Sequence, residues 1–446
     1  MSLLPIAENG VAACLKAGAD EAEVYVTRGF EIGVSVEAGS IKSASQQTAD
    51  GVGIRAFKNT GLGFAYVNSL DEGRVKEAAA RAVSLAKVSP SDENNVMPEP
   101  SRPAPKIEGL YDAAAETFEV GAALRQVHDM LKAAHGVDPR VAIEGGGFSA
   151  SASSRAVVNS KGVKAEDSQS LFSCLLVALA RDGEDVSCMT FEFEDARNAK
   201  GINAVNVGLS AAKQAVESLG TKKIASFKGT VVLHPFAVET LLAAWLLSAS
   251  DAGNVQKGMS KWAGKIGTQV ASSLFTVEDD GLLAGGTAST PFDREGIPPA
   301  PMKLVNCGIL ENYFFNSYTA RKDKKTSNGH AAGGMRQVPG IGPTNVRILP
   351  GPMPLQKMLA DVRRGVLVTR LAGWPNTVTG DFSGVVKGGF LIENGAISVP
   401  VTETLISGNV AEFLGRISGV SQESRKADSG LTSPYVRIDD VSITGR

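Results

Sequence analysis

The sequence has few of the residue types on which many redox and metal sites are built. Its 446 residues include only four cysteines and four histidines. The cysteines are scattered, and none belongs to a C-x-x-C pair. This scatter argues against a disulfide framework and a cysteine-rich zinc site, and it favours a reducing compartment. The four cysteines are Cys14, Cys174, Cys188 and Cys307.

Long hydrophobic runs and a strong net charge are also missing. The run from Leu241 to Leu247, among the longest, is far short of the ~20 residues that a membrane-spanning helix needs. Pro5 and Glu8 interrupt the N-terminus, which lacks the basic start of a signal peptide. The formal net charge of -2 gives no broad attraction to nucleic acid or anionic membrane. We therefore expect a soluble cytoplasmic protein without direct nucleic-acid or membrane partners.

Several catalytic signatures are absent as well. There is no G-x-S-x-G nucleophile elbow, no Walker A motif and no G-x-G-x-x-G after a predicted strand. His128 and His135 lie two turns apart on one predicted helix, about 10 Å, which is too far to share one metal directly. His234 ends a predicted strand, and its simplest interpretation is a residue that starts a helix and is hydrogen-bonded locally. Catalytic machinery is therefore absent or hidden.

Some acidic residues remain as candidates for chemistry. Asp279 is followed by Asp280, and Asp293 lies two residues before Glu295. Such pairs can act as general acid and base or bind a divalent ion. In glycine-rich turns, however, carboxylates more commonly form loops and caps.

The first half of the chain favours helices with antiparallel strands. In the stretch Glu21 to Arg28, Ala22, Val24 and Val26 alternate with Glu23, Tyr25 and Thr27, which predicts a half-buried strand. Similar alternation follows, then a helix, Asp71 to Lys87, and a second cycle of helix and strands. Between the cycles, residues 88–105 contain five prolines and predict an exposed, stiff linker. The further predicted strands are 32–36, 40–46, 52–57, 62–67, 140–148, 155–159, 168–180 and 186–194, and the further helices are 117–135 and 203–219.

The second half opens on the stretch Gly229 to Asp251. Val231 to Leu233 predict a buried strand, and Pro235 suits the first turn of the helix that follows. That helix is apolar nearly all round, so it belongs inside a domain. Glycine-rich short strands follow, with a long surface loop at 321–343. We expect an α+β fold, with an N-terminal domain at 1–222 and a β-rich domain at 223–446.

Three blocks of the sequence, in order, resemble the TldD/PmbA family, once named for modulation of DNA gyrase. They are EIGVSVEAGSIKSASQQTADGVGIRAF, TPFDREGIPPAPMKLVNCGILENYFFNSYTARK and VTGDFSGVVKGGFLIENGAISVPVTETLISGN. The resemblance implies a dimer of two-domain α+β chains. For the TldD type it also implies a zinc peptidase, with ligands from a His-Glu-x-x-x-His helix and a cysteine near the C-terminus.

At the motif positions this chain departs from the TldD type. The resemblance places Ala243, Ala244 and Ser248 where His, Glu and His would stand, and the region 423–436 contains no cysteine. It therefore implies the PmbA/TldE branch, without a cofactor of its own, paired with a TldD-type subunit that carries zinc. The complex would degrade unfolded or extended peptides. The residues expected near a cleft are His234, Asp293, Glu295, Tyr318 and His330.

Two alternatives stay open. The chain could be a stand-alone homodimeric peptidase that uses a non-standard site, or a regulator of a DNA-associated protein. Whether the chain by itself is an enzyme is left open by the sequence, as are its peptide substrate and its partner.

Overall fold

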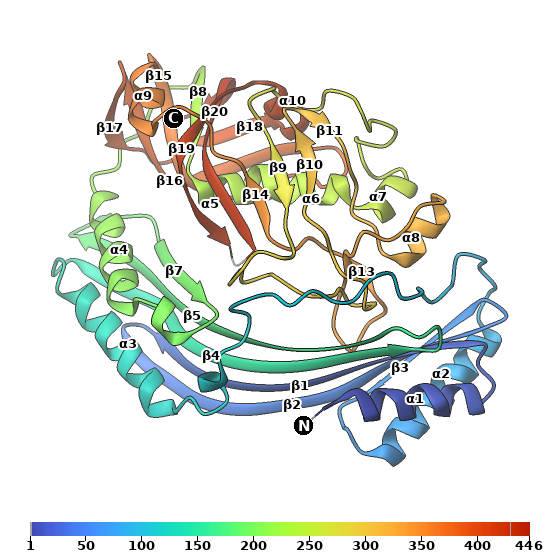
Figure 1. Ribbon diagram of the computed structural model, residues 1–446. Helices are drawn as coiled ribbons and strands as arrows, with labels where there is room; N and C mark the ends of the chain where they lie inside the picture. Colours follow the sequence, from blue (N-terminus) through green and yellow to red (C-terminus); the bar gives the residue numbers. More distant parts are fainter. Residues whose placement is uncertain (1, 429) are drawn as a thin grey trace.

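The described part of the chain folds into two large sheets with helices packed against them, and a separate two-stranded sheet (Figure 1). The computed structural model describes residues 2–428 and 430–446. A long curved sheet from the N-terminal half lies under a second, strongly curled sheet from the C-terminal half (Figure 1). The expected α+β class, with antiparallel strands first and a β-rich part after them, is confirmed.

The N-terminal sheet has seven strands, and β1 and β4 lie at its centre. Because β1 pairs antiparallel with β4, the two predicted helix-and-strand cycles share one sheet. The strands predicted at 21–28 and 32–36 form one continuous strand, and so do those predicted at 40–46 and 52–57. The predicted interruptions are wrong, because pairing with neighbouring strands continues through Gly29 and Gly51. The strands are β1 (Glu21–Glu37), β2 (Ser40–Lys58), β3 (Gly61–Val67), β4 (Val141–Asn159), β5 (Lys164–Asp182), β6 (Asp185–Val186) and β7 (Thr190–Ala196).

Two pairs of helices cover this sheet, one pair towards each end (Figure 1). The predicted helix after Ser69 is confirmed, and the side chain of Asp71 caps it by accepting from Arg74 N. Gly63 of β3 lets that helix approach closely, because a Cβ there would lie 1.9 Å from Ala82 O. The helices are α1 (Leu4–Lys16), α2 (Glu72–Val88), α3 (Val120–His135) and α4 (Ala204–Glu217), with short turns η1 (Ala113–Ala115) and η2 (Ala199–Gly201).

The proline-rich segment 88–105 is extended, but the prediction that it is an exposed linker is wrong at Met97, which is 3% exposed. Met97 N donates to Glu21 Oε2 at 2.7 Å, and Asn159 Nδ2 donates to Pro98 O at 2.8 Å. Arg102 Nη2 donates to Pro299 O in the C-terminal half. The segment is therefore fixed between the two halves.

Five strands of the C-terminal sheet close into a ring, because β20 pairs with both β18 and β8. The ring strands are β8 (Phe227–Leu233), β15 (Arg364–Ala372), β16 (Asp381–Glu393), β18 (Leu405–Asn409) and β20 (Leu431–Thr444). Further strands of this sheet are β9 (Val277–Asp279), β10 (Met302–Asn306), β11 (Ile309–Leu310), β14 (Val346–Ile348), β17 (Ala396–Pro400) and β19 (Ile417–Asp428). The pair β12 (Ala331–Ala332) and β13 (Gly340–Ile341) stands apart.

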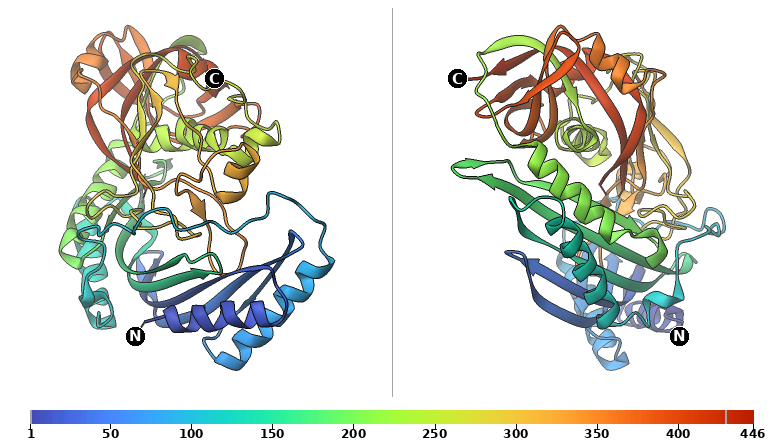
Figure 2. Two further views of the ribbon diagram at one scale, coloured as in Figure 1. Left: turned by 45° about the vertical axis from the view of Figure 1, so that its right-hand side comes forward. Right: turned by 90° about the vertical axis from the view of Figure 1, so that its left-hand side faces the viewer.

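The buried helix predicted after Pro235 is confirmed, and the strands of the C-terminal sheet surround it (Figure 2). Leu242, Trp245 and Ala249 are fully buried in its core. It consists of α5 (Pro235–Val238), a π-helical turn η3 (Glu239–Ala243) and α6 (Ala244–Ser250). The other helices are α7 (Ala252–Gln256), α8 (Ser317–Lys322), α9 (Leu355–Ala360) and α10 (Val410–Gly415). Within the described ranges, no helix is both long and apolar enough to cross a membrane.

The close packing of α2 on β3 predicts that Gly63→Ala destabilises the chain. The added methyl would overlap backbone atoms of α2, so we expect a loss of about 1–3 kcal/mol in the free energy of unfolding. Gly334→Ala is the control, because a Cβ there meets nothing within 4 Å. Urea unfolding of both variants measures the difference, and equal stability would contradict this packing.

Candidate functional site

The positions to which the family resemblance assigns the metal motif lie on the helix inside the C-terminal sheet. Ala243 is buried, whereas Ala244 and Ser248 are half-buried. Ala243 ends the π-helical turn, and Ala244 and Ser248 follow it; Ala244 N donates to Glu239 O five residues back. Thr240 Oγ1 also donates to Phe236 O at 3.1 Å, a side-chain bond that competes with regular helix bonds. Such π turns occur frequently at functional sites.

The side chains at these positions do not fit a zinc ion. Protein ligands of zinc are thiolates, imidazoles and carboxylates, and the methyl groups of Ala243 and Ala244 offer no such atom. Ser248 Oγ accepts a hydrogen bond from Asn254 Nδ2 at 3.2 Å. Among residues 2–428 and 430–446, no three His, Cys, Asp or Glu side chains gather as a metal-binding group.

His234 starts the same helix, as its sequence position predicts. Its Nδ1 accepts from Phe236 N at 3.2 Å, and its ring packs edge-on against Tyr435. Burial, together with the positive charge of Arg425, lowers the pKa of His234 to about 3. The imidazole is therefore neutral near pH 7 and acts as a helix cap.

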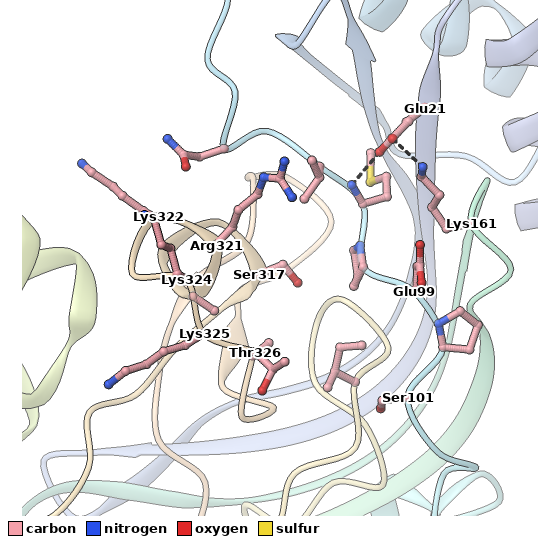
Figure 3. A pocket seen from close by; sticks show the side chains of 18 of the residues that line it. Glu21, Glu99, Ser101, Lys161, Ser317, Arg321, Lys322, Lys324, Lys325 and Thr326 are labelled. Atoms are coloured by element: carbon pink, nitrogen blue, oxygen red, sulfur yellow. Dashed lines mark hydrogen bonds and ion pairs between the residues drawn. The ribbon is translucent and has the colours of Figure 1, made fainter.

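A cavity of about 990 Å³ lies between the proline-rich segment and the region of α8 (Figure 3). Tyr318 does not line it. Its hydroxyl donates to Asp92 Oδ2 at 2.8 Å, and this bond raises the pKa of Tyr318 above its ordinary value. Tyr318 thus fixes α8 to the proline-rich segment.

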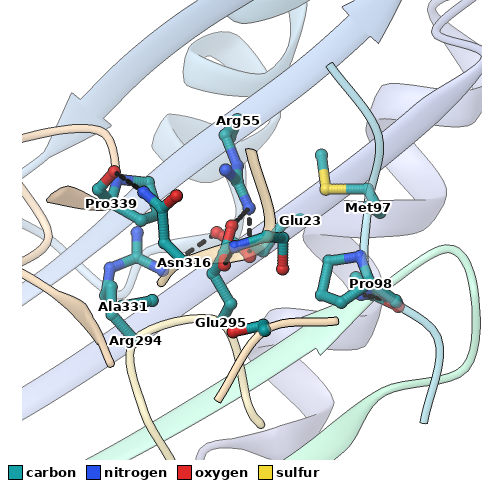
Figure 4. A network of polar contacts seen from close by, with 12 residues as sticks. Glu23, Arg55, Met97, Pro98, Arg294, Glu295, Asn316, Ala331 and Pro339 are labelled. Carbon is teal, nitrogen blue, oxygen red and sulfur yellow. Dashed lines mark hydrogen bonds and ion pairs between the residues drawn. The ribbon is translucent and has the colours of Figure 1, made fainter. Parts of the chain in front are cut away.

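Next to this cavity, four buried charged side chains join the two halves of the chain (Figure 4). Arg55 Nη2 of β2 donates to Glu23 Oε2 of β1 and to Glu295 Oε1, both at 2.8 Å. Arg294 Nη1 donates to Glu23 Oε1 at 2.9 Å, and its guanidinium lies 3.9 Å from the centre of the Tyr25 ring. We call Glu23, Arg55, Arg294 and Glu295 the interface charge cluster.

The interface charge cluster corrects the prediction that the face of β1 containing Glu23 and Tyr25 is exposed. Both side chains are buried, because the loop with Arg294 and Glu295 covers that face. Burial alone lowers the pKa of Arg55, but the adjacent carboxylates of Glu23 and Glu295 outweigh it and raise the pKa above its ordinary value. The two carboxylates thus compensate the two buried guanidinium groups.

Asp293 is buried in the turn that precedes Glu295. Its Oδ1 accepts from the backbone N–H groups of Glu295 and Ile297, and its Oδ2 accepts from Ala331 N, all at 2.9 Å. Burial and the nearby charge of Glu295 raise the pKa of Asp293 to about 7, despite these donors. Asp293 therefore holds the turn together, as the cap interpretation of this pair predicts.

His330 is also buried, although its loop was predicted to lie on the surface. Its Nε2 lies 3.0 Å from Asp279 Oδ1, and its Nδ1 lies 2.9 Å from Asn328 Oδ1. The Asn328 oxygen faces this ring because Asn328 Nδ2 donates to Tyr313 O and Oδ1 accepts from Phe315 N. Both ring nitrogens of His330 are therefore engaged in structural contacts.

The structure brings some of the predicted site residues together and separates others. Asp293, Glu295 and His330 lie close together, since Asp293 accepts from the backbone of both loops that contain them. His234 lies elsewhere, against Phe236 and Tyr435. Sequence reasoning missed Glu23, Arg55, Arg294 and Ser317. For Glu23 and Arg55 the signal was a charged residue among apolar ones in a predicted strand; Arg294 and Ser317 lie outside the strands, and no local pattern marked them.

Sequence profiles of a metallopeptidase family match nearly the whole chain. The profile described as PmbA/TldA metallopeptidase domain 1 matches residues 22–86. The central-domain profile matches residues 114–219, and the C-terminal-domain profile matches residues 226–445.

Individual proteins agree with the profiles. An uncharacterized protein of Methanocaldococcus jannaschii is 29% identical over 88% of this chain and 89% of its own length. The metalloprotease PmbA of Escherichia coli O157:H7 is 27% identical over 96% of this chain and 93% of its own. The crystal structure of TldE from Thermococcus kodakarensis superimposes with a TM-score of 0.89 at 27% identity, covering 98% of this chain and 99% of that one.

The interface charge cluster predicts that Glu23→Gln is strongly destabilising. The substitution removes one of the two carboxylates that balance the buried guanidinium groups of Arg55 and Arg294. We therefore expect a loss of about 3–5 kcal/mol in the free energy of unfolding. Asp50→Asn breaks a matched but half-exposed pair, Arg28 with Asp50, and we expect it to cost less than about 1 kcal/mol. Urea unfolding of both variants tests this difference, and similar small losses would show that the cluster is not needed.

The low pKa of His234 predicts a specific pH dependence. Its pKa falls from 6.5 to about 3 on folding, so the unfolded chain binds more protons between these values. Its contribution to stability is complete above pH 6.5 and declines as the pH falls towards 3. Between pH 7.5 and 5, we expect wild type to lose about 2 kcal/mol more than His234→Asn, which keeps a capping side chain.

Unfolding in urea at both pH values measures this difference. His128→Asn is the control, because His128 is exposed and its replacement should leave the wild-type pH dependence intact. If His234→Asn also behaves like wild type, His234 does not stay neutral in the folded chain.

Proposed function

Since the chain belongs to the PmbA/TldD family of metallopeptidases, we propose that it acts as a PmbA/TldE-type subunit of a TldD-type metalloprotease complex. In this proposal the chain has no metal of its own, and zinc is held by the partner. The observation that carries the proposal is the helix with Ala243, Ala244 and Ser248. The helix is enclosed and contains a π-helical turn, but the side chains at these three positions are not of the types that bind zinc.

We also propose that the chain helps to enclose extended peptides. β1 pairs with β2 along residues 40–57, but β3 pairs only with residues 52–58. In the described part of the chain, residues 40–51 therefore have an edge without a partner strand, and residues 40–49 are exposed. An extended peptide, or an edge of the partner subunit, can add to such a strand through main-chain hydrogen bonds.

The contacts of His234 and His330 argue against a stand-alone peptidase that uses either of them. His234 caps a helix, and His330 is buried with both ring nitrogens engaged. Neither offers a free imidazole to a substrate. The alternative of a regulator acting on a DNA-associated protein gains no support from the net charge of -2.

Co-expression with a TldD-type protein from the same genome tests the proposal. We expect cleavage of an unfolded peptide substrate only when both chains are present, and we expect it to survive His234→Ala. Metal analysis after dialysis should find zinc in the complex and no stoichiometric zinc in this chain alone. Stoichiometric zinc in the isolated chain, or peptide cleavage by it, would overturn the proposal.

A further inference from the structure

The cavity of about 990 Å³ between the proline-rich segment and α8 has a polar lining that the proposed function does not use. One wall is the extended segment 93–101, and the other is α8 with the loop that follows it, up to residue 327 (Figure 3). We call this cavity the junction cleft, because its two walls come from the two halves of the chain. Its volume lies within the range of about 300–1,000 Å³ that ligand sites occupy.

The walls of the junction cleft differ in charge. On the wall of segment 93–101, Lys161 is neutralised by Glu21 at 2.8 Å, and Glu93 and Glu99 are acidic. The opposite wall has four cations, none of which forms an ion pair within the described residues. These cations are Arg321, Lys322, Lys324 and Lys325.

The cation best placed to bind a ligand is Arg321. It reaches from α8 towards segment 93–101, whereas Lys322 and Lys325 extend along the outer side (Figure 3). Its Nε donates to Glu93 O at 3.0 Å, so the guanidinium is held in the opening. A guanidinium can bind a carboxylate through two parallel hydrogen bonds, and the neighbouring lysines add an attractive field for anions.

A second observation points to a ligand at the same place. Ser317 lines the junction cleft and is only 8% exposed, yet its Oγ has no hydrogen-bond partner. Its backbone N donates to Glu295 Oε2 at 2.8 Å, which fixes the residue against the interface charge cluster. Buried hydroxyl groups normally have partners, so the unpartnered Ser317 hydroxyl is a donor that a bound group could engage.

We propose that the junction cleft binds an acidic segment of an extended peptide, with a carboxylate held by Arg321 and the Ser317 hydroxyl. This inference rests on the proposed function, because it identifies the class of peptide that the subunit prefers. Apolar side chains also line the cleft, among them Val96, Pro98 and Ile297, and they suit the apolar neighbours of an acidic residue. A single small anion would leave most of this volume and apolar surface uncovered.

The test is the binding of short fluorescein-labelled peptides to the full isolated chain, followed by fluorescence anisotropy. A peptide of alternating Glu and Ala should bind about tenfold more tightly than the Gln–Ala peptide and weaken as salt is raised. Equal binding of the two peptides would overturn the proposal. So would displacement of the Glu–Ala peptide by inorganic phosphate at the same affinity, since that identifies a small-anion site.

Variants separate binding from folding. Arg321→Gln and Ser317→Ala should each weaken binding of the Glu–Ala peptide by about fivefold or more. Ser317→Ala keeps the backbone bond to Glu295, so its thermal stability should equal that of wild type. Lys213→Gln, on the exposed side of α4, is the matched charge control and should bind normally. If Arg321→Gln binds as well as Lys213→Gln does, the assignment is wrong.

This outcome is independent of the test of the subunit role. Binding of the Glu–Ala peptide is measured without a partner, so it can succeed even if co-expression yields no protease. Conversely, a working complex that cleaves acidic and neutral peptides equally well would contradict the proposal that the junction cleft selects acidic peptides. The subunit role would still be supported.

Discussion

The interface charge cluster is the contact on which the arrangement of the two halves depends. Glu23 and Arg55 come from the neighbouring strands β1 and β2 of the N-terminal sheet, and Arg294 and Glu295 come from a loop of the C-terminal half. Each is nearly inaccessible to water, so the cost of burying one charge is offset only if the others stay in place. Because each buried charge needs the others in place, the two sheets are held in one relative position.

The proposed functions depend on that fixed position. The backbone N–H of Ser317 donates to Glu295, so the α8 wall of the junction cleft is attached directly to the interface charge cluster. The other wall, segment 93–101, is held by Glu21 on the strand that also contains Glu23. In the proposed subunit role the chain contributes these fixed walls, and its helix at 235–250 is enclosed by the C-terminal sheet.

Local signals in the sequence predicted much of this fold, but not its long-range contacts. Asp71 and Pro235 mark helix starts through chemistry that lies within one turn, and alternation located the strands. The alternation of apolar and polar residues along β1 separates the two faces of the strand, but it does not show what covers the polar face. Glu23 was therefore predicted to be exposed. Its partner Arg294 lies 271 residues away. The π-helical turn and the burial of His330 likewise depend on tertiary contacts. The family resemblance supplied the metal-motif positions, which no local pattern marks.

The most direct test of this account is whether the two halves unfold as one cooperative unit. All three tryptophans, Trp245, Trp262 and Trp374, lie in the C-terminal half, so their fluorescence reports unfolding there. Amide hydrogen exchange of β1 and β4, measured across the same urea series, reports on the N-terminal sheet. If the interface charge cluster holds the two halves together, both signals change at a single shared urea midpoint. Loss of protection in β1 and β4 at lower urea than the tryptophan transition would contradict it.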